Sequence, residues 1–338
     1  MTDNFEEMID CFVKPKQILF LSADLVGSTA LKQIKRDFAG KHIPDSEKWA
    51  KVIQELFLKI SSKFAKISSE NNNTEIKYSN KPILWKTVGD EIIYRKYISN
   101  HSEIYDTVLD WIAAAKETRS ELKSQFSSDL DIKCTAWLGE FPILNRVILG
   151  AGHQTVVDFT NGISSTLSSI VNFETSPVKA GFEIDFIGPS VDIGFRLSRL
   201  ASSRKFIISV DTAYLLMKCL ITNRKRKSKL PKIFYEGTVH LSGVFGGLTY
   251  PVFWIDMSSE ADHESLEKLE DKLVKREPCD LEKAIEFCET FYAERSIFID
   301  QPFIIGDKDL HPNDIPSWYN SAMESTKEIY RKSDIPEQ

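Results

Sequence analysis

Cysteine is scarce in this sequence, and no long apolar segment is present. The five cysteines are Cys11, Cys134, Cys219, Cys279 and Cys288. They lie far apart and form no Cys-x-x-Cys pair, which argues against a disulfide framework and against a zinc site. No apolar run approaches the ~18 residues that span a bilayer, and the acidic start MTDNFEEMIDCF lacks the features of a signal peptide. We therefore expect a cytoplasmic protein with no membrane partner.

A surplus of positive charge is also missing. The 338 residues carry a formal net charge of -6, whereas domains that bind a nucleic-acid backbone usually present a basic surface. The apolar fraction of 42% and the charged fraction of 27% are typical of a globular protein with a substantial core. We expect no nucleic-acid partner, although one positively charged pocket for a small anion is compatible with this composition.

Strand and helix patterns alternate along most of the chain. Short apolar runs predict strands, and apolar residues at helical spacing predict helices. The expected strands lie at 17–23, 81–95 (two strands with a bend at Gly89), 131–140, 206–210 and 235–255. The expected helices lie at 46–67 and 103–124. The segment 183–201 is expected to contain a strand, a Gly-Pro turn and a helix. Ser46 and Asp211 are the expected N-terminal caps of their helices, and 163–172 is a further candidate helix.

Tight turns between neighbouring strands favour an α+β fold over a doubly wound parallel sheet. We expect a ferredoxin-like core, in which a mixed, mostly antiparallel sheet packs against helices on one face. Beyond Met257 the sequence becomes charged and amphipathic without strand character. We therefore expect one domain at 1–257 and a C-terminal helical extension at 258–338.

Two aspartates stand at the predicted ends of strands. Asp24 closes the first apolar strand, and Asp90 lies in the hairpin. Carboxylates together with substrate phosphates are the usual ligands of Mg²⁺ or Mn²⁺, and two such ions can activate a hydroxyl and stabilise a leaving pyrophosphate. Gly27, Ser28 and Thr29 follow Asp24 and open a helix whose N–H groups suit a phosphate tail. Turn capping explains each of these residues equally well when it is considered alone.

The segment from Asp185 to Arg196 reads DFIGPSVDIGFR. It places one acid at the end of a strand and a second acid, Asp192, four residues before Arg196 on the helix that follows. Arginine offers a planar fork of donors and stays charged, so it suits charge that develops on a transferring phosphoryl group. A surface ion pair between Asp192 and Arg196 is the alternative interpretation.

Three segments together resemble the signature segments of class III adenylate and guanylate cyclases. They are FLSADLVGST at 20–29, KTVGD at 86–90 and the segment at 185–196, and the similarity covers roughly residues 17–256. The resemblance implies that Asp24, Asp90 and the Leu25 carbonyl bind two Mn²⁺ or Mg²⁺ ions per site, that Lys86 and Asp185 read the base, and that Arg196, with Asp192 in the place of an asparagine, acts on the transition state. It also implies a homodimer whose two sites each combine Asp24 and Asp90 of one chain with the remaining residues of the other.

Several features depart from the family pattern. Ionised Asp192 only accepts hydrogen bonds, so it cannot donate to the ribose as asparagine would; it could instead orient Arg196. The turn at 241–247 lacks the usual phosphate-binding lysine, and the basic run at 224–229 is either its replacement or a solvated loop. Phe20 and Phe186 are candidate substrate contacts that would narrow the base pocket, although core positions explain both.

These departures and the insert at 141–180 resemble the Pycsar pyrimidine cyclases of bacterial anti-phage defence. That resemblance implies conversion of UTP, in preference to CTP, to the 3′,5′-cyclic monophosphate, which activates a separate effector. A cation beside a carboxylate pairs with adenine, cytosine or uracil, so an adenylate cyclase is an alternative. An inactive cyclase-like binding or dimerisation module and a diguanylate cyclase or polymerase are alternatives of other classes; a full GGDEF loop is absent.

Overall fold

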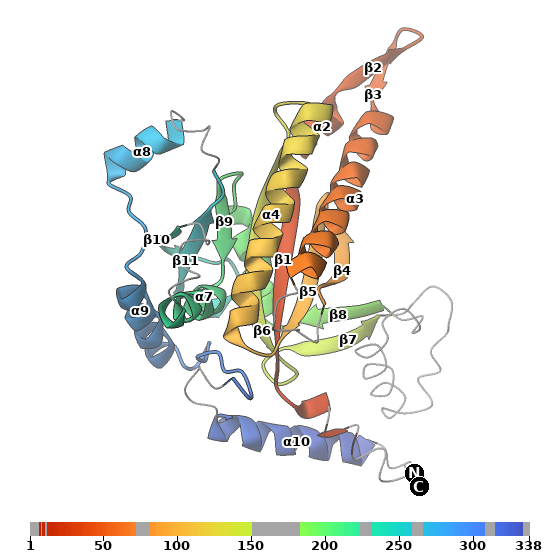
Figure 1. Cartoon of the computed structure of the whole chain (residues 1–338). Helices are drawn as coiled ribbons and strands as arrows, with labels where there is room; N and C mark the ends of the chain where they lie inside the picture. Colours follow the sequence, from red (N-terminus) through yellow and green to blue (C-terminus); the bar gives the residue numbers. More distant parts are fainter. Residues whose placement is uncertain are drawn as a thin grey trace.

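A seven-stranded sheet organises the protein, as the computed structural model in Figure 1 shows. The structure describes residues 7, 9–10, 12–71, 81–150, 183–223, 232–258, 266–307 and 315–333. The strand order in the sheet is β10-β11-β9-β6-β1-β5-β4. The seven strands are β1 (Lys16–Val26), β4 (Ile83–Val88), β5 (Glu91–Ile98), β6 (Asp131–Phe141), β9 (Lys205–Ile208), β10 (Ile233–His240) and β11 (Thr249–Asp256).

Four of these strands and two long helices form the ferredoxin-like unit. In chain order the unit is β1, α3 (Ser46–Asn71), β4, β5, α4 (His101–Gln125) and β6. Its strands are antiparallel, with β1 and β5 in the middle. Beyond β6 the sheet continues through β9, which is parallel to β6, and then through β11 and β10. The α+β prediction, with a mostly antiparallel sheet, is therefore confirmed.

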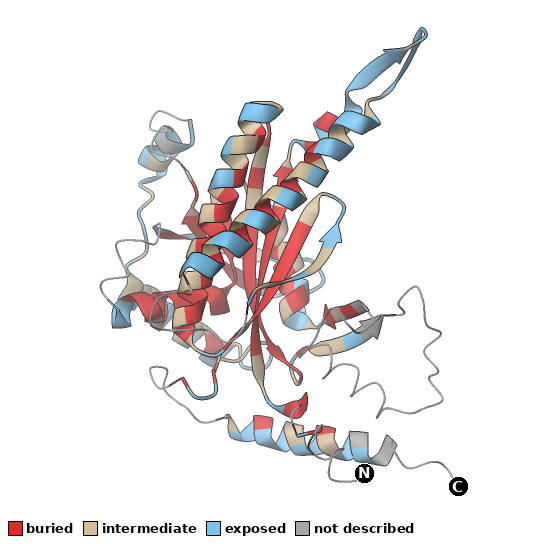
Figure 2. Ribbon diagram, turned by 45° about the vertical axis from the view of Figure 1, so that its right-hand side comes forward, coloured by how far each residue is buried: buried red, intermediate tan, exposed pale blue. Residues whose placement is uncertain are grey.

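Side chains from the two faces of β1 belong to different apolar clusters. Leu19 and Leu21 belong to the large cluster that includes residues of α3, α4 and α7 (Val210–Thr222). Ile18 and Phe20 belong to a smaller cluster with Trp137. Successive strand residues point to opposite faces, so a strand covered on both sides needs apolar residues at every position. This explains the unbroken apolar run that marks β1, which is buried along most of its length (Figure 2).

Two helix caps differ from the prediction. Helix α3 begins at Ser46, but the cap is Asp45, whose carboxylate accepts a hydrogen bond from the Lys48 N–H at 3.3 Å. Helix α7 is capped by Ser209, which accepts from the Thr212 N–H; Asp211 instead lies buried in the first turn. In each case an acceptor one or two residues earlier bonds a free N–H of the first turn, and Ser209 has the extended backbone typical of a cap. The candidate helix at 163–172 lies outside the described residues.

Two shorter pairs of strands lie outside the main sheet. Strands β2 (Lys35–Phe38) and β3 (Lys41–Pro44) form a hairpin that projects from the end of the molecule near α2 (Ser28–Gln33). Strands β7 (Arg146–Gly150) and β8 (Glu183–Ile187) pair with each other and lead into α6 (Pro189–Leu197). The second pair therefore sets the position of Asp185 and of the helix that carries Arg196.

The C-terminal helices are α8 (Leu266–Val274), α9 (Leu281–Glu294) and α10 (Ser317–Ser333). Helix α9 packs against α7, and its residues Ile285, Cys288 and Tyr292 join the large apolar cluster. The predicted helical character of this region is confirmed, although 259–265 lie outside the described residues. Among the described helices, none is long and apolar enough to cross a membrane.

Candidate active site

Asp24 and Asp90 meet at one edge of the sheet. Asp24 is opposite Glu91 in the pairing of β1 with β5, and Asp90 lies in the tight turn that joins β4 to β5. Each carboxylate is paired with a lysine: Lys133 Nζ lies 2.9 Å from Asp24 Oδ2, and Lys32 Nζ lies 3.2 Å from Asp90 Oδ1. The structure thus brings together the two aspartates that the sequence singles out.

The pKa values of the two carboxyl groups are shifted in opposite directions. Burial raises the pKa of Asp24, the nearby Asp90 raises it further, and Lys133 opposes both. Burial also acts to raise the pKa of Asp90, but hydrogen bonds from Ser28 and Lys32 outweigh it and hold that pKa below its ordinary value. Two acids this close disfavour joint ionisation, so a bound cation would relieve their repulsion.

Glu91 is a third acid at this edge that the sequence reading did not single out. Its carboxylate is buried, and burial raises its pKa, with Ser22 opposing. Its Oε1 has no hydrogen-bond partner in the part of the chain that the structure describes. A buried acceptor without a partner costs free energy. Its importance follows from its register opposite Asp24, which the sequence alone does not show.

These residues fit a site for divalent cations. Asp24 and Asp90 supply hard oxygen ligands from adjacent strands, and the Leu25 carbonyl is the next oxygen along β1. Mg²⁺ is commonly held by one or two carboxylates together with substrate phosphates. Within the described residues no group of three His, Cys, Asp or Glu side chains is arranged to hold a metal ion by itself, so the phosphates of a substrate would have to complete the coordination.

The residues after Asp24 form the predicted turn and helix. Gly27 has a positive φ of 85° and precedes α2. Ser28 is buried and hydrogen-bonds Asp90, whereas Thr29 is exposed. Ser28 therefore positions the second aspartate, while Gly27 and Thr29 are the members of this turn that are open to a ligand.

Lys86 and Asp185 form a second group. Lys86 Nζ lies 2.7 Å from Asp185 Oδ1 and 4.2 Å from the centre of the Trp85 ring, and the Phe195 ring lies 5.7 Å away. The lysine therefore stands over aromatic faces, which attract a cation. Trp85 was missed in the sequence; its position next to Lys86 on an edge strand was the available signal.

Phe20 and Phe186 lie in the interior of the aromatic cluster, not on an open surface. Phe20 is fully buried and Phe186 is 2% exposed. Their ring centres are 5.3 Å apart, and both contact Trp85 at 5.0 and 5.2 Å. Both rings are buried in this structure and pack against Trp85, so a direct contact of either ring with a substrate stays a prediction. Apolar side chains of the smaller cluster surround Phe20 in β1 and Phe186 in β8, which explains why both rings are buried.

Helix α6 carries the third group. Asp192 is exposed, whereas Arg196 is partly buried and donates from Nε to the Ser242 carbonyl at 2.9 Å. No ion pair joins Asp192 to Arg196 in the described part of the chain, so no contact there supports orientation of Arg196 by Asp192. The turn at 241–247, which lacks a lysine, supplies the carbonyl that Arg196 binds. The basic run at 224–229 lies outside the described residues.

Two glycines allow this helix to sit close to the sheet. Gly188 has a φ of 138°, and a Cβ there would lie 2.5 Å from Asn145 Oδ1. The Asn145 side chain accepts from the Ser190 N–H at the start of α6. A Cβ on Gly194 would lie 2.2 Å from the Trp137 ring. A side chain at position 188 or 194 would clash with these neighbours, so close packing requires glycine at both positions.

The acidic edge and the Lys86–Asp185 pair are separate within one chain. Among the described residues, no hydrogen bond or ion pair connects Asp24, Asp90 or Glu91 to Lys86, Asp185 or Arg196. One group therefore offers carboxylate oxygens that could bind cations, and the other offers cationic donors together with a carboxylate acceptor.

Comparison with solved structures returns nucleotide cyclase domains. The adenylyl cyclase CyaB from P. aeruginosa aligns over 73% of this chain and 97% of its own, at 14% identity and a TM-score of 0.47. The guanylyl cyclase Cya2 aligns over 72% and 92%, at 13% identity and a TM-score of 0.44. The guanylate cyclase domain of RhGC from Catenaria anguillulae, solved with GTP, aligns over 72% and 97%, at 12% identity and a TM-score of 0.42.

No protein-family model matches the chain, and no curated protein matches it. Similarity at the level of these structures does not establish an activity. The functional case rests on the residues of the site.

Proposed function

We propose that this protein is a nucleotide cyclase of the class III type that converts a pyrimidine nucleoside triphosphate, UTP in preference to CTP, to its 3′,5′-cyclic monophosphate and pyrophosphate. The observation that carries the proposal is the meeting, at one sheet edge, of Asp24, Asp90 and a Glu91 oxygen that has no hydrogen-bond partner among the described residues. Ring closure requires a 3′-hydroxyl to attack the α-phosphorus while pyrophosphate leaves.

Asp24, Asp90 and the Leu25 carbonyl would hold two Mn²⁺ or Mg²⁺ ions. Such ions, when bound, favour ionisation of the attacking hydroxyl and neutralise charge on the phosphates. The protein's own contribution is to keep both carboxylates adjacent: Ser28 hydrogen-bonds Asp90, and Lys133 holds Asp24. The two lysines would have to release the carboxylates or share them when cations bind.

The base would be read by Lys86 and Asp185. Their contact at 2.7 Å provides a donor beside an acceptor. For uracil, Lys86 donates to a ring carbonyl and Asp185 accepts from the ring N–H; for cytosine, the ring nitrogen and amino group pair with the same two residues. The Trp85 ring beneath Lys86, backed by Phe20 and Phe186, adds bulk at this position, which favours a one-ring base.

Arg196 would stabilise charge on the phosphates in the transition state. Its Nε is engaged by Ser242, which leaves the terminal guanidinium nitrogens available to oxygen ligands. Asp192 is exposed on the same helix and would contact the ribose as an acceptor. Gly27 and Thr29 would face the phosphate tail from the metal side.

A homodimer would unite the separated groups. In a head-to-tail pair, Asp24 and Asp90 of one chain would face Lys86, Asp185, Asp192 and Arg196 of its partner, which gives two equivalent sites. Leu84 and Val88 of the edge strand β4 are 47% and 50% exposed, and exposed apolar residues on an edge strand are suited to an interface. The product would act on a separate effector in anti-phage defence.

The proposal is tested by incubating the purified chain with Mn²⁺ and each of the four nucleoside triphosphates separately. We expect cyclic UMP as the main product, less cyclic CMP, and little cyclic AMP or cyclic GMP. Dominant cyclic AMP would make the protein an adenylate cyclase and would remove the pyrimidine assignment. Binding of triphosphate without any turnover would instead identify an inactive cyclase-like module.

A further inference from the structure

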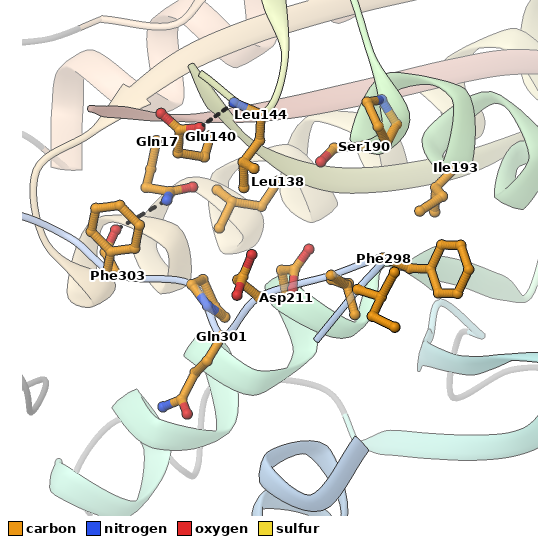
Figure 3. A pocket seen from close by; sticks show the side chains of 15 residues that line it. Gln17, Leu138, Glu140, Leu144, Ser190, Ile193, Asp211, Phe298, Gln301 and Phe303 are labelled. Atoms are coloured by element: carbon orange, nitrogen blue, oxygen red, sulfur yellow. Dashed lines mark hydrogen bonds between the residues drawn. The ribbon is translucent and has the colours of Figure 1, made fainter. Parts of the chain in front are cut away.

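A cavity lies beneath the C-terminal segment, apart from the residues assigned above to catalysis. It has a volume of about 190 Å³ and lies between β6, the start of α6, α7 and residues 297–303 (Figure 3). The segment over it is tied to the core by Gln17, whose amide donates to the Phe303 carbonyl at 3.0 Å, and by Gln301, which donates to the Tyr214 hydroxyl at 2.7 Å.

One carboxylate in this cavity, that of Asp211, has a hydrogen-bond partner among the described residues on only one of its two oxygens. Asp211 is only 9% exposed, and its Oδ1 accepts from the Tyr292 hydroxyl at 2.9 Å. Its Oδ2 has no hydrogen-bond or ion-pair partner within the described residues. The side chain points from α7 into the cavity (Figure 3). This oxygen faces the cavity, so it is open to a ligand that brings a hydrogen-bond donor.

The surroundings of Asp211 are acidic and apolar. Glu140 is buried and already engaged by the Tyr319 hydroxyl and the Leu144 N–H, while Asp300 adds a third carboxyl group. Lysine, arginine and histidine are absent from the described residues that line the cavity. Apolar side chains form the rest of the wall, including Leu138, Ile193 and Phe298. Burial raises the pKa of Asp211 and of Glu140 to about 7 and also raises the pKa of Asp300, so the apolar wall disfavours their ionised forms. A cation with an apolar body would stabilise an ionised carboxylate here while keeping the rest of the wall covered.

We propose that this cavity is a second binding site, which takes a small organic cation with its charged donor group on Asp211 Oδ2 and its apolar body against Leu138, Ile193 and Phe298. An amidinium, guanidinium or ammonium group supplies the missing donor. In the described part of the chain no three His, Cys, Asp or Glu side chains are arranged to hold a metal ion, so the cation must bring its own hydrogen-bond donors. An apolar cavity of about 150 Å³ in another protein accepts benzene, so this volume suits one ring with a small polar group.

The position of the cavity links it to the catalytic helix. Ser190 and Ile193 line the cavity, and both belong to α6, which also carries Asp192 and Arg196. A molecule bound here would touch the first turns of that helix without touching the residues assigned to the substrate. Binding itself does not depend on the proposed activity and can be measured without it.

The test uses benzamidine as the probe and the isosteric neutral benzamide as its control. Titration of the full chain by calorimetry should show benzamidine binding, with benzamide at least about tenfold weaker because a charge-assisted hydrogen bond is lost. Asp211→Asn keeps the acceptor for Tyr292 but removes the charge, and it should weaken benzamidine by a similar factor. Glu103→Gln changes another buried carboxylate, one that does not line the cavity, and should bind benzamidine as the unmodified chain does.

A second measurement guards against a variant that fails to fold. In the unmodified chain, methyl NMR should show benzamidine shifting the Ile193 and Ile299 signals, and benzamide leaving them unchanged. Equal binding of the charged and neutral probes, or unchanged benzamidine binding by folded Asp211→Asn, overturns the proposal. Absence of any benzamidine binding overturns it as well.

Discussion

At the scale of single residues, Asp24 lies in an environment that disfavours its ionised form. Its carboxyl group has a raised pKa because of burial and of Asp90 beside it. A carboxyl whose pKa is raised on folding disfavours ionisation, so in the absence of metal this group makes the protein less stable as the pH rises from its ordinary value through the raised one. A divalent cation would reverse that effect by favouring the ionised form.

Asp24→Asn tests this consequence. In the unmodified chain, Mn²⁺ at a hundred times its dissociation constant should add about 2.7 kcal/mol of stability, which is an increase of several degrees in Tm. The variant should lose most of this increase and all turnover. Differential scanning fluorimetry with and without Mn²⁺ measures it. Glu286→Gln, an exposed substitution on α9, is the control; a full Mn²⁺ shift in Asp24→Asn would show that the metal binds elsewhere.

The sequence identified candidate site residues at the ends of strands, but it did not identify their neighbours in the folded structure. Asp24 and Asp90 could be predicted because the apolar run and the Gly89 bend fix where each strand stops. Glu91 and Trp85 could not, because their importance comes from the register of β5 against β1 and from the ring beneath Lys86. Burial of Phe20 and Phe186 depends on packing between distant elements, which a single sequence does not specify.

At the scale of elements, the position of α6 depends on its contact with β6. Gly194 lies against the indole of Trp137, which is fully buried and stacked on Phe20 with ring centres 5.3 Å apart. The Phe195 ring also lies beside the indole, with ring centres 5.6 Å apart. Any side chain at 194 must therefore move the helix, and Asp192 and Arg196 would move with it.

Gly194→Ala should consequently reduce kcat more than it reduces stability. Overpacking of this kind costs about 1–3 kcal/mol, whereas a displacement of about 1 Å in a catalytic group can cost roughly 100-fold in rate. Steady-state kinetics beside thermal unfolding separates the two effects. Arg199→Ala, an exposed change just after the same helix, should have little effect on either. An unchanged kcat in the folded alanine variant would mean that α6 does not position the reacting groups.

The elements themselves were largely predictable, because hydrophobic periodicity reports them directly. The hairpin at 81–95 and the helices at 46–67 and 103–124 all appear, with somewhat different ends. The caps at Asp45 and Ser209 were assigned one or two residues away, since Ser46 and Asp211 are equally plausible capping residues by type. Arg196 binding to Ser242 joins two segments 46 residues apart, and no local pattern encodes it.

At the scale of the whole molecule, the proposed site requires two chains. The acidic edge and the Lys86–Asp185–Arg196 side are each incomplete, so each inactive variant should still contribute one intact half. Asp90→Ala removes the metal half, and Arg196→Ala removes the other. Each variant alone should be inactive as a homodimer.

Mixing these two variants should restore activity. If chains exchange freely, half of the dimers are mixed and one of their two sites is intact, which gives about a quarter of the activity of the unmodified protein. Product formation after co-incubation measures this, and a mixture of Asp90→Ala with Asp24→Ala is the matched control, because both changes remove the same half. Persistent inactivity of the first mixture, with exchange verified, would place the complete site within one chain.

The most direct test of the central claim is a competition among all four triphosphates. The chain is incubated with Mn²⁺ and an equimolar mixture of ATP, GTP, CTP and UTP, and the products are identified by mass spectrometry, with a preparation of the Asp24→Ala variant as the blank. The account predicts that cyclic UMP dominates, accompanied by pyrophosphate, and that the blank forms no cyclic nucleotide. Dominance of cyclic AMP or cyclic GMP, a preparation that forms no cyclic nucleotide, or activity that survives in the blank would contradict it.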